Sequence, residues 1–218
     1  ICSCAQIVLA LGSTMAQNSF ATERFFDLSG FSQASIFTGA SYVWEVLPKI
    51  EAYVKGLLDG QKVKIGEGTQ VEEGAYVKGP AIIGKNCFIA HGVYIREHVI
   101  IGDSVHIGHG VEVKNSIIMA NTAVAHLNYI GDSVVGNNVN IGGGAKTANF
   151  RLDGQTIRIK NEVGVIDTGL AKLGAIIGDD SKIGVNAVLN PGTVLGKGCH
   201  VYPLTSVTGV HGDGERIT

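Results

Sequence analysis

The feature that most constrains the fold is a six-residue spacing of aliphatic side chains. Counting in sixes from Ile65 reaches nine β-branched residues in succession, the last of them Val113, and a second aliphatic run extends from Ile177 to Val207. A period of six is neither the 3.6 of a helix nor the alternation of a single long strand. The pattern therefore predicts short strands separated by tight corners, with the aliphatic residues pointing inward.

Glycine is abundant, with 31 of the 218 residues, and is placed where the corners are expected. We expect the glycines that directly follow inward residues to supply the unusual φ angles of the corners. These glycines are Gly66, Gly84, Gly102, Gly108, Gly178, Gly184 and Gly196. Asn or Asp takes other turn positions, as in Lys85-Asn86, Gly102-Asp103 and Gly136-Asn137.

The hexad pattern resembles the left-handed parallel β-helix of hexapeptide-repeat proteins, an all-β solenoid in which three hexads form one triangular coil. The register slips by one residue at Ile118 and again at Val135, and small residues lie two positions before the inward ones. We expect residues 61–218 to form this β-helix.

Residues 1–60 are expected to be an N-terminal extension whose segment 42–58 forms a helical cap over the open end of the solenoid. Pro48 lies near the first turn of that helix, where proline is tolerated. Within residues 150–175 the pattern breaks, and Asp153-Gly154 predicts the turn of a projecting hairpin.

Composition excludes several classes of protein. With 17 Lys and Arg against 19 Asp and Glu and no basic tract, nucleic acid and anionic membrane are poor partners. The four cysteines show no metal-ligand spacing and no disulfide density, so we expect a cytoplasmic protein. No apolar run reaches the length of a membrane span. Residues 1–14 look slightly like a signal peptide but lack its basic start, so we expect them to be an artefact of where the sequence begins.

A motif falls between residues 111 and 150, inside the region of slipped register. It consists of Lys114, the HLNYIGD run at 126–132, the run 139–144, and Asn149-Phe150. This order resembles the acetyltransferase domain of the bifunctional glucosamine-1-phosphate acetyltransferase and N-acetylglucosamine-1-phosphate uridylyltransferase family, and residues 172–179 resemble its archaeal relatives. Members of that family carry a large N-terminal nucleotidylyltransferase domain, whereas fewer than 65 residues precede the repeats here. We therefore expect no nucleotidyl chemistry.

Acetyl transfer from a thioester to an amine needs a proton acceptor, donors for the oxyanion, and cations where the acceptor carries a phosphate. The resemblance implies that His126 is the catalytic base, and a neutral imidazole can take that proton. The other histidines lack this context and are expected to be solvated: His91, His98, His106, His109, His200 and His211. The alternative for His126 is a surface histidine that stabilises a corner.

The resemblance also implies a set of substrate-binding residues. Arg96 and Lys114 are 18 residues apart, which places them one coil apart on the same edge, where two cations suit a phosphate dianion. The remaining residues implied to contact substrate are Tyr129, Asn140, Asn149 and Arg158. Solvated charges, a packed corner tyrosine and ordinary turn asparagines are the alternatives.

Coenzyme A binding is implied for Gly143, Val185 and Pro203, although this sequence departs from the family at each. Phe150 also replaces a tyrosine, which removes a hydroxyl. Donor binding would then depend more on backbone amides and on a groove between coils. No metal is expected, because no two histidines have the five-residue spacing found in zinc hydratases of similar fold.

The resemblance implies a homotrimeric enzyme that moves acetyl from acetyl-CoA to the amine of glucosamine 1-phosphate, with its site between neighbouring subunits. Galactosamine 1-phosphate and a nucleotide-linked amino sugar are alternative acceptors. A non-enzymatic solenoid that binds sugar phosphate is a further alternative from a different class.

Overall fold

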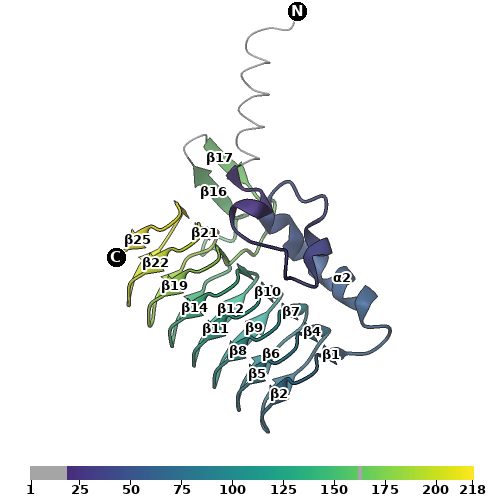
Figure 1. Cartoon of the computed structure of the whole chain (residues 1–218). Coiled ribbons are helices and arrows are strands. Elements are labelled where there is room, and N and C mark those ends of the chain that lie inside the picture. The colour runs from purple at the N-terminus through teal and green to yellow at the C-terminus, as the bar shows by residue number, and fades with distance from the viewer. Residues whose placement is uncertain (1–18, 162–163) are drawn as a thin grey trace, which may run out of the picture.

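The computed structural model of the chain describes residues 19–161 and 164–218. The signal-like start and the cysteines Cys2 and Cys4 therefore lie outside the described residues. Short parallel strands stack into a left-handed parallel β-helix, with an N-terminal segment along one side and a hairpin projecting from it (Figure 1). The hexad pattern therefore predicts the fold class correctly.

Each side of the triangular coil is a parallel sheet. Sheet 1 consists of β1 (Val63–Ile65), β4 (Ala81–Ile83), β7 (Val99–Ile101), β10 (Ser116–Ile118), β13 (Val134–Val135), β18 (Ala175–Ile177), β21 (Thr193–Leu195) and β24 (Val210–His211). Sheet 2 consists of β2 (Gln70–Val71), β5 (Phe88–Ile89), β8 (His106–Ile107), β11 (Ala123–Val124), β14 (Asn140–Ile141), β19 (Lys182–Ile183), β22 (His200–Val201) and β25 (Arg216–Ile217). Sheet 3 consists of β3 (Tyr76–Val77), β6 (Tyr94–Ile95), β9 (Glu112–Lys114), β12 (Tyr129–Gly131), β15 (Lys146–Thr147), β20 (Val188–Leu189) and β23 (Ser206–Val207).

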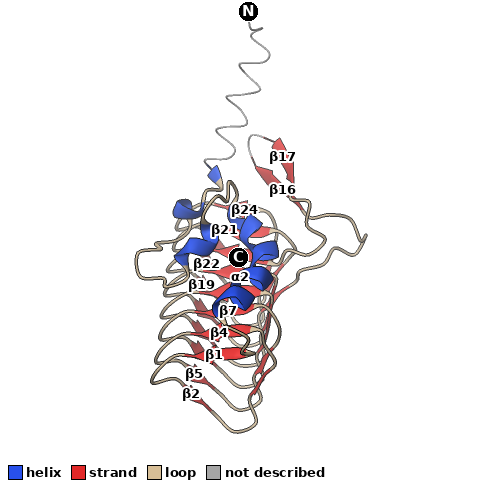
Figure 2. Cartoon of the chain, turned by 90° about the vertical axis from the view of Figure 1, so that its right-hand side faces the viewer, coloured by secondary structure: helices blue, strands red, loops and turns tan. Residues whose placement is uncertain are grey.

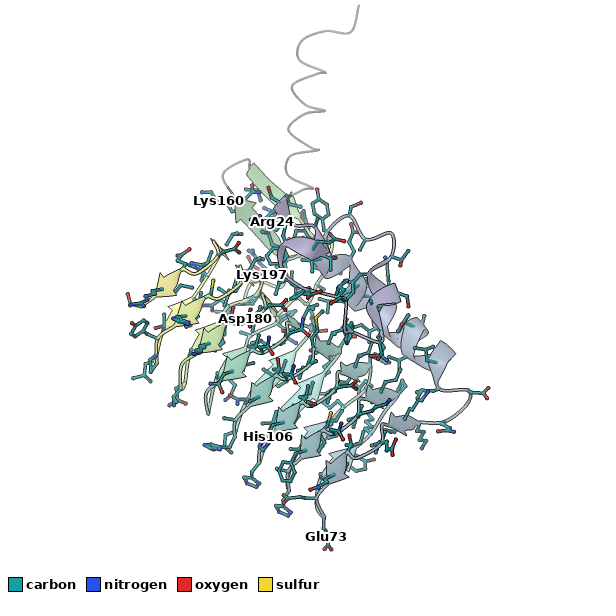
Figure 3. The ribbon with its side chains drawn as sticks, in the orientation of Figure 1. Arg24, Glu73, His106, Lys160, Asp180 and Lys197 are labelled. Carbon is teal, nitrogen blue, oxygen red and sulfur yellow. The ribbon has the colours of Figure 1, made fainter. Side chains whose placement is uncertain are left out.

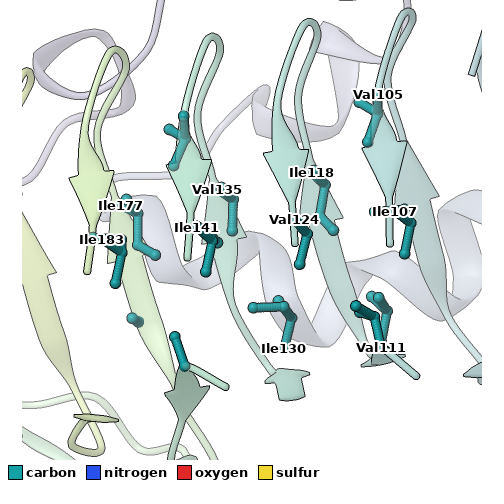
Figure 4. Close-up of a cluster of buried hydrophobic side chains, with 14 of the residues drawn as sticks. Val105, Ile107, Val111, Ile118, Val124, Ile130, Val135, Ile141, Ile177 and Ile183 are labelled. Atoms are coloured by element: carbon teal, nitrogen blue, oxygen red, sulfur yellow. The ribbon is translucent and has the colours of Figure 1, made fainter. Parts of the chain in front are cut away.

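The hexad aliphatics fill the interior of the solenoid, as Figure 4 shows for its middle coils. Both register slips are confirmed, because Ile118 pairs with Ile101 on one side and with Val135 on the other, a spacing of 17 residues instead of 18. The first coil is the exception to burial. Ile65 and Val71 are 47% and 39% exposed because no coil lies beneath them.

The corner glycines do not serve the purpose predicted for them. Gly84 and its counterparts have ordinary φ angles, and a Cβ on Gly84 would lie 2.5 Å from the carbonyl carbon of Gly102 in the next coil. Close approach of successive coils therefore requires these glycines. Positive φ occurs two residues later, as at Asn86 with φ of 54° and Gly110 with φ of 69°. After the predicted pairs Gly102-Asp103 and Gly136-Asn137, positive φ is found at the next residue, Ser104 or Asn138, and not within the pair.

The N-terminal segment lies along the outer face of sheet 1 and not over the open end of the solenoid (Figure 2). Its helices are η1 (Thr22–Arg24), η2 (Ala34–Phe37), η3 (Val43–Lys49) and α2 (Ile50–Leu57). The predicted helix over 42–58 is thus 3₁₀ in its first half, where Pro48 lies, and α-helical in its second. The predicted end cap is wrong.

The reason is an outward-facing aliphatic stripe on sheet 1. The middle residue of each of these strands points away from the solenoid interior. The stripe consists of Ile82, Ile100, Ile117, Val134, Ile176 and Val194, all buried. Phe26, Trp44 and Ile50 of the N-terminal segment pack in the same cluster. The inner strands of sheet 1 are therefore buried on both faces, which is why β4, β7 and β18 read as unbroken apolar runs.

The projecting hairpin also differs from its prediction. Strand β16 (Arg158–Asn161) pairs antiparallel with β17 (Gly164–Asp167), so Asp153-Gly154 lies before both strands of the hairpin and not between them. Those two residues form an earlier surface turn, in which the Asp153 carboxylate binds the Arg151 guanidinium and the Gly154 N–H donates to the Arg151 carbonyl. Asp153-Gly154 is therefore a turn, as its residue types indicate, but it is not the turn of the hairpin.

Candidate functional site

Two shortened corners between sheets 3 and 1 account for the register slips. One coil uses residues 96–98 to pass from sheet 3 to sheet 1, whereas the next uses only Lys114 and Asn115. The following coil is equally short, with Gly131 and Asp132 at this corner. Asn115 and Asp132 have φ of 43° and 47°, a conformation that short polar side chains tolerate. Because each of these corners is one residue shorter, polar groups of adjacent coils come close together.

Asp132 is the centre of this polar cluster and is only 4% exposed. Its carboxylate accepts hydrogen bonds from Asn115 Nδ2 at 2.9 Å, from Lys114 Nζ at 3.1 Å and from the amide of Asn149. A buried carboxylate needs this number of partners. Asp132 therefore orients the lysine ammonium and the asparagine amide, both of which border the adjacent pocket.

The pocket at this corner has a volume of about 280 Å³, and we call it the cationic pocket. It is lined by Arg96, Lys114, Tyr129, Asn149, Phe150 and Lys172. Arg96 forms an ion pair with Glu112 at 2.8 Å, and Lys114 with Asp132 at 3.1 Å. Lys172 has no ion pair within the described part of the chain. Three cations with a hydroxyl and an amide are suited to bind a phosphorylated polar ligand.

The Tyr129 hydroxyl is oriented as a donor toward this pocket. Asn149 Nδ2 donates to its oxygen at 3.1 Å, which leaves the phenolic proton free for a ligand. Burial and the nearby Asp132 charge raise the pKa of Tyr129, so the phenol remains protonated at neutral pH. The ring lies across Gly131, where a Cβ would clash with the hydroxyl. The glycine of the HLNYIGD run is therefore needed for the tyrosine to reach the pocket.

His126 lies at the opposite edge of sheet 3, on the corner that follows sheet 2. His91 and His109 occupy the same corner in the two preceding coils, with parallel rings whose centroids are 5.7 Å apart. Each ties its Nδ1 to a carbonyl of the coil before, at 2.7 Å. Hydrogen bonds therefore hold these two histidines, whereas the sequence predicted that they would be solvated.

The imidazole of His126 differs from these two. The carbonyl of His109 instead accepts the backbone N–H of Leu127 at 2.9 Å. His126 makes no side-chain hydrogen bond to any described residue, and its ring is exposed. Both ring nitrogens are therefore open to a ligand, as a general base requires.

The residues implied to bind coenzyme A continue the same corner. The carbonyls of His126, Gly143 and Val185 accept backbone N–H groups from Gly144, Asn186 and Leu204. These bonds place His126, Gly143, Val185 and Pro203 in four successive coils, and we call this line the corner column. A Cβ on Gly143 would lie 3.0 Å from His126 Cδ2, so only a bare backbone leaves the imidazole unhindered.

A second pocket, of about 360 Å³, adjoins the corner column on the outer face of sheet 2. Val185 and Pro203 line it together with Asn140, Lys182, His200 and Tyr202. Asn140 is thus separated from the other residues implied to bind the sugar.

The structure brings together Arg96, Lys114, Tyr129 and Asn149. It places His126 apart from them, because the width of sheet 3 lies between the corner column and the cationic pocket. Arg158 is on the hairpin, where its Nε lies 3.6 Å from the Asp167 carboxylate, and it does not line the cationic pocket.

Sequence reasoning missed Lys172 in the cationic pocket and Asp132 in the polar cluster beside it. Lys172 falls in the stretch where the hexad period stops, so its spacing carried no information about position. Asp132 had a usable signal, since it directly follows the HLNYIG residues at a corner. Its burial and its role as a common acceptor depend on the shortened corners, which periodicity locates only to within several residues.

Comparison with known families agrees with this architecture. The family profile described as "Bacterial transferase hexapeptide (six repeats)" matches residues 174–209. The profile described as "GMPPB C-terminal domain" matches residues 77–170, which include His126 and most of the cationic pocket.

Curated relatives match part of the chain. A bifunctional sugar-1-phosphate nucleotidylyltransferase/acetyltransferase of Sulfurisphaera tokodaii is 38% identical over 97 residues, which are 44% of this chain and 24% of the relative. The bifunctional protein GlmU of Methanocaldococcus jannaschii is 37% identical over 83 residues, 38% of this chain and 20% of the relative. An uncharacterized acetyltransferase, YaiX, of Escherichia coli O6 is 37% identical over 79 residues, 36% and 34% of the two chains. The alignments thus span at most about a third of each relative.

Among solved structures, the acetyltransferase domain of PglB from Neisseria gonorrhoeae in complex with acetyl coenzyme A aligns with 93% of this chain and 72% of that chain. The TM-score is 0.36 and the identity 18%, values at which the alignment carries no argument about function. In the part of the chain that the structure describes, no three His, Cys, Asp or Glu side chains are grouped to hold a metal ion. None of the described helices has the length and apolar character needed to cross a bilayer.

Proposed function

We propose that the chain transfers an acetyl group from acetyl-CoA to the amine of glucosamine 1-phosphate. The observation that carries this proposal is the cationic pocket, in which Arg96, Lys114 and Lys172 face the Tyr129 hydroxyl and the Asn149 amide. The cations suit the phosphate dianion, and the hydroxyl and amide suit a sugar. The names of the partial relatives, which include sugar-1-phosphate nucleotidylyltransferase/acetyltransferase, support the same class of substrate.

The corner column supplies the groups for the chemical step. The amine attacks the thioester carbonyl while the His126 imidazole takes its proton, and the coenzyme A thiolate leaves as the amide forms. The Gly143 N–H has no acceptor among the described residues, and Gly143 packs against the His126 imidazole, so this N–H is the donor we propose for the oxyanion.

We further propose that the complete site forms between two copies of the chain in a homotrimer. Within one copy, His126 lies at the opposite edge of sheet 3 from the cationic pocket and does not line it. A neighbour packed around a three-fold axis brings its pocket to the His126 corner.

A thiol-release assay with acetyl-CoA and glucosamine 1-phosphate tests the reaction. We expect turnover in the wild type and a loss of about 10²–10⁴-fold in kcat for His126→Ala, the usual contribution of a general base. Galactosamine 1-phosphate and a nucleotide-linked amino sugar in the same assay identify the preferred acceptor. Full activity of His126→Ala would remove the mechanism, and sugar-phosphate binding without turnover would favour a binding protein.

Mixed assemblies test whether two copies share the site. His126→Ala and Lys114→Ala are each expected to be nearly inactive alone. When they are co-expressed, about a quarter of the interfaces join an intact His126 to an intact cationic pocket, so activity returns to about a quarter of the wild-type value. A site within one chain would show no recovery.

A further inference from the structure

Three basic side chains form a row on the outer face of sheet 2, at its C-terminal end. Lys182 pairs in register with His200, and His200 with Arg216, so the three occupy adjacent strands about 4.8 Å apart. We call them the basic row. None of the three forms an ion pair within the described ranges 19–161 and 164–218.

The charge is concentrated here and not spread over the sheet. The same outward position in the earlier strands is held by Gln70, Phe88, His106, Ala123 and Asn140. The acidic residues that closely precede these strands in the sequence have partners of their own: Asp180 accepts from Asn138 Nδ2 at 3.0 Å, and Glu215 lies 2.7 Å from His211 Nδ1. The basic row is therefore available to an anionic ligand.

The basic row is continuous with the second pocket, since Lys182 and His200 line it beside Val185, Tyr202 and Pro203. From Pro203, the corner column reaches His126 in three coil steps, about 14 Å at the spacing of parallel strands. A ligand whose phosphates bind the basic row can therefore extend an arm along the column to the imidazole.

We propose that Lys182, His200 and Arg216 bind the phosphate groups of coenzyme A, with the 3′-phosphate and the diphosphate spread along the row. This assignment rests on the proposed function for the identity of the ligand. Charge-assisted hydrogen bonds from Lys182 and Arg216, with a further hydrogen bond from the His200 imidazole between them, suit several phosphate groups on one molecule. The thioester then lies toward Gly143 and His126 at the far end of the column.

Titration calorimetry with adenosine 3′,5′-bisphosphate tests the basic row without any acetyl transfer. Lys182→Ala and Arg216→Ala are each expected to raise its Kd about tenfold, the usual effect of losing one hydrogen bond to a charged group. Lys182→Arg keeps the charge and is expected to keep most of the affinity. Lys160→Ala is the matched control, because Lys160 is an exposed lysine on the projecting hairpin (Figure 3).

A second measurement compares acetyl-CoA with its 3′-dephospho form as donor. We expect the 3′-dephospho donor to raise KM in the wild type and to change it little in Lys182→Ala and Arg216→Ala, with kcat unaffected. Wild-type Kd in both alanine variants, or no binding by the wild type, would overturn the proposal. Binding that depends on Lys182 in a protein that acetylates none of the sugars would leave the basic row standing and remove the proposed function.

Discussion

Replacing Asn128 with valine is expected to stabilise the fold, although it removes a polar residue from the HLNYIGD run. The side chain is 2% exposed, and neither its Nδ2 nor its Oδ1 has a hydrogen-bonding partner among the described residues. Asn128 holds the inward position before a strand of sheet 3, as do Val111 and Ala145 in the adjacent coils. An unpartnered buried amide costs about 1–3 kcal/mol. A gain of about 2 kcal/mol would raise Tm by about 4–8 °C for a chain of this length.

Urea denaturation at fixed protein concentration measures this effect as a higher midpoint with an unchanged slope. The matched control is Val111→Asn, which places the same amide one coil earlier and is expected to lower the midpoint by a similar amount. A lower midpoint for Asn128→Val would show that the amide is satisfied in the folded protein and that the reasoning is wrong.

Three further predictions concern other parts of the fold. The pKa of Tyr129 is raised in the folded state, so the protonated phenol contributes stability that is complete below pH 10 and is lost as the pH rises through the folded-state pKa. Tyr129→Phe should therefore lose less stability than the wild type when urea denaturation is repeated at increasingly alkaline pH. Gly84→Ala forces a Cβ into the backbone of the next coil and should lower stability by about 1–3 kcal/mol in the same assay, whereas Gly212→Ala, which meets open space, should change it little. Burial raises the pKa of Cys87 and Cys199, so neither should be alkylated at pH 8 in the native protein, as peptide mass mapping would show; rapid native modification would contradict their burial.

The fold could be predicted because the period acts on every coil in the same way. Ile101, Ile118 and Val135 are inward residues at a spacing that sequence alone reveals, including its two slips. The physical reason why glycine occupies the corners could not be predicted from the sequence period. Both a positive φ and a close approach of backbones favour glycine, and only coordinates distinguish Gly84, which avoids a clash, from Gly110, which has positive φ.

The sequence does carry a signal for the position of the N-terminal segment. Runs such as Ala81–Ile83 and Val99–Ile101 place an aliphatic residue on the outer face as well as on the inner one, which predicts a sheet covered on both sides. Residues of the candidate site could be predicted from the sequence where they follow the six-residue period, as Arg96 and Lys114 do. The position of Lys172 could not be predicted, because the chain returns from the projecting hairpin to the solenoid at a place that no periodicity specifies.

The covered stripe on sheet 1 also limits how copies of the chain can associate. With Trp44 and its neighbours already packed there, a second copy cannot pack on this stripe, whereas the outer faces of sheets 2 and 3 are left uncovered by that segment. An arrangement with sheet 3 turned toward a three-fold axis leaves the basic row on sheet 2 facing outward. In the proposed trimer the N-terminal segment thus excludes one packing face, although none of its described residues lines either proposed ligand pocket.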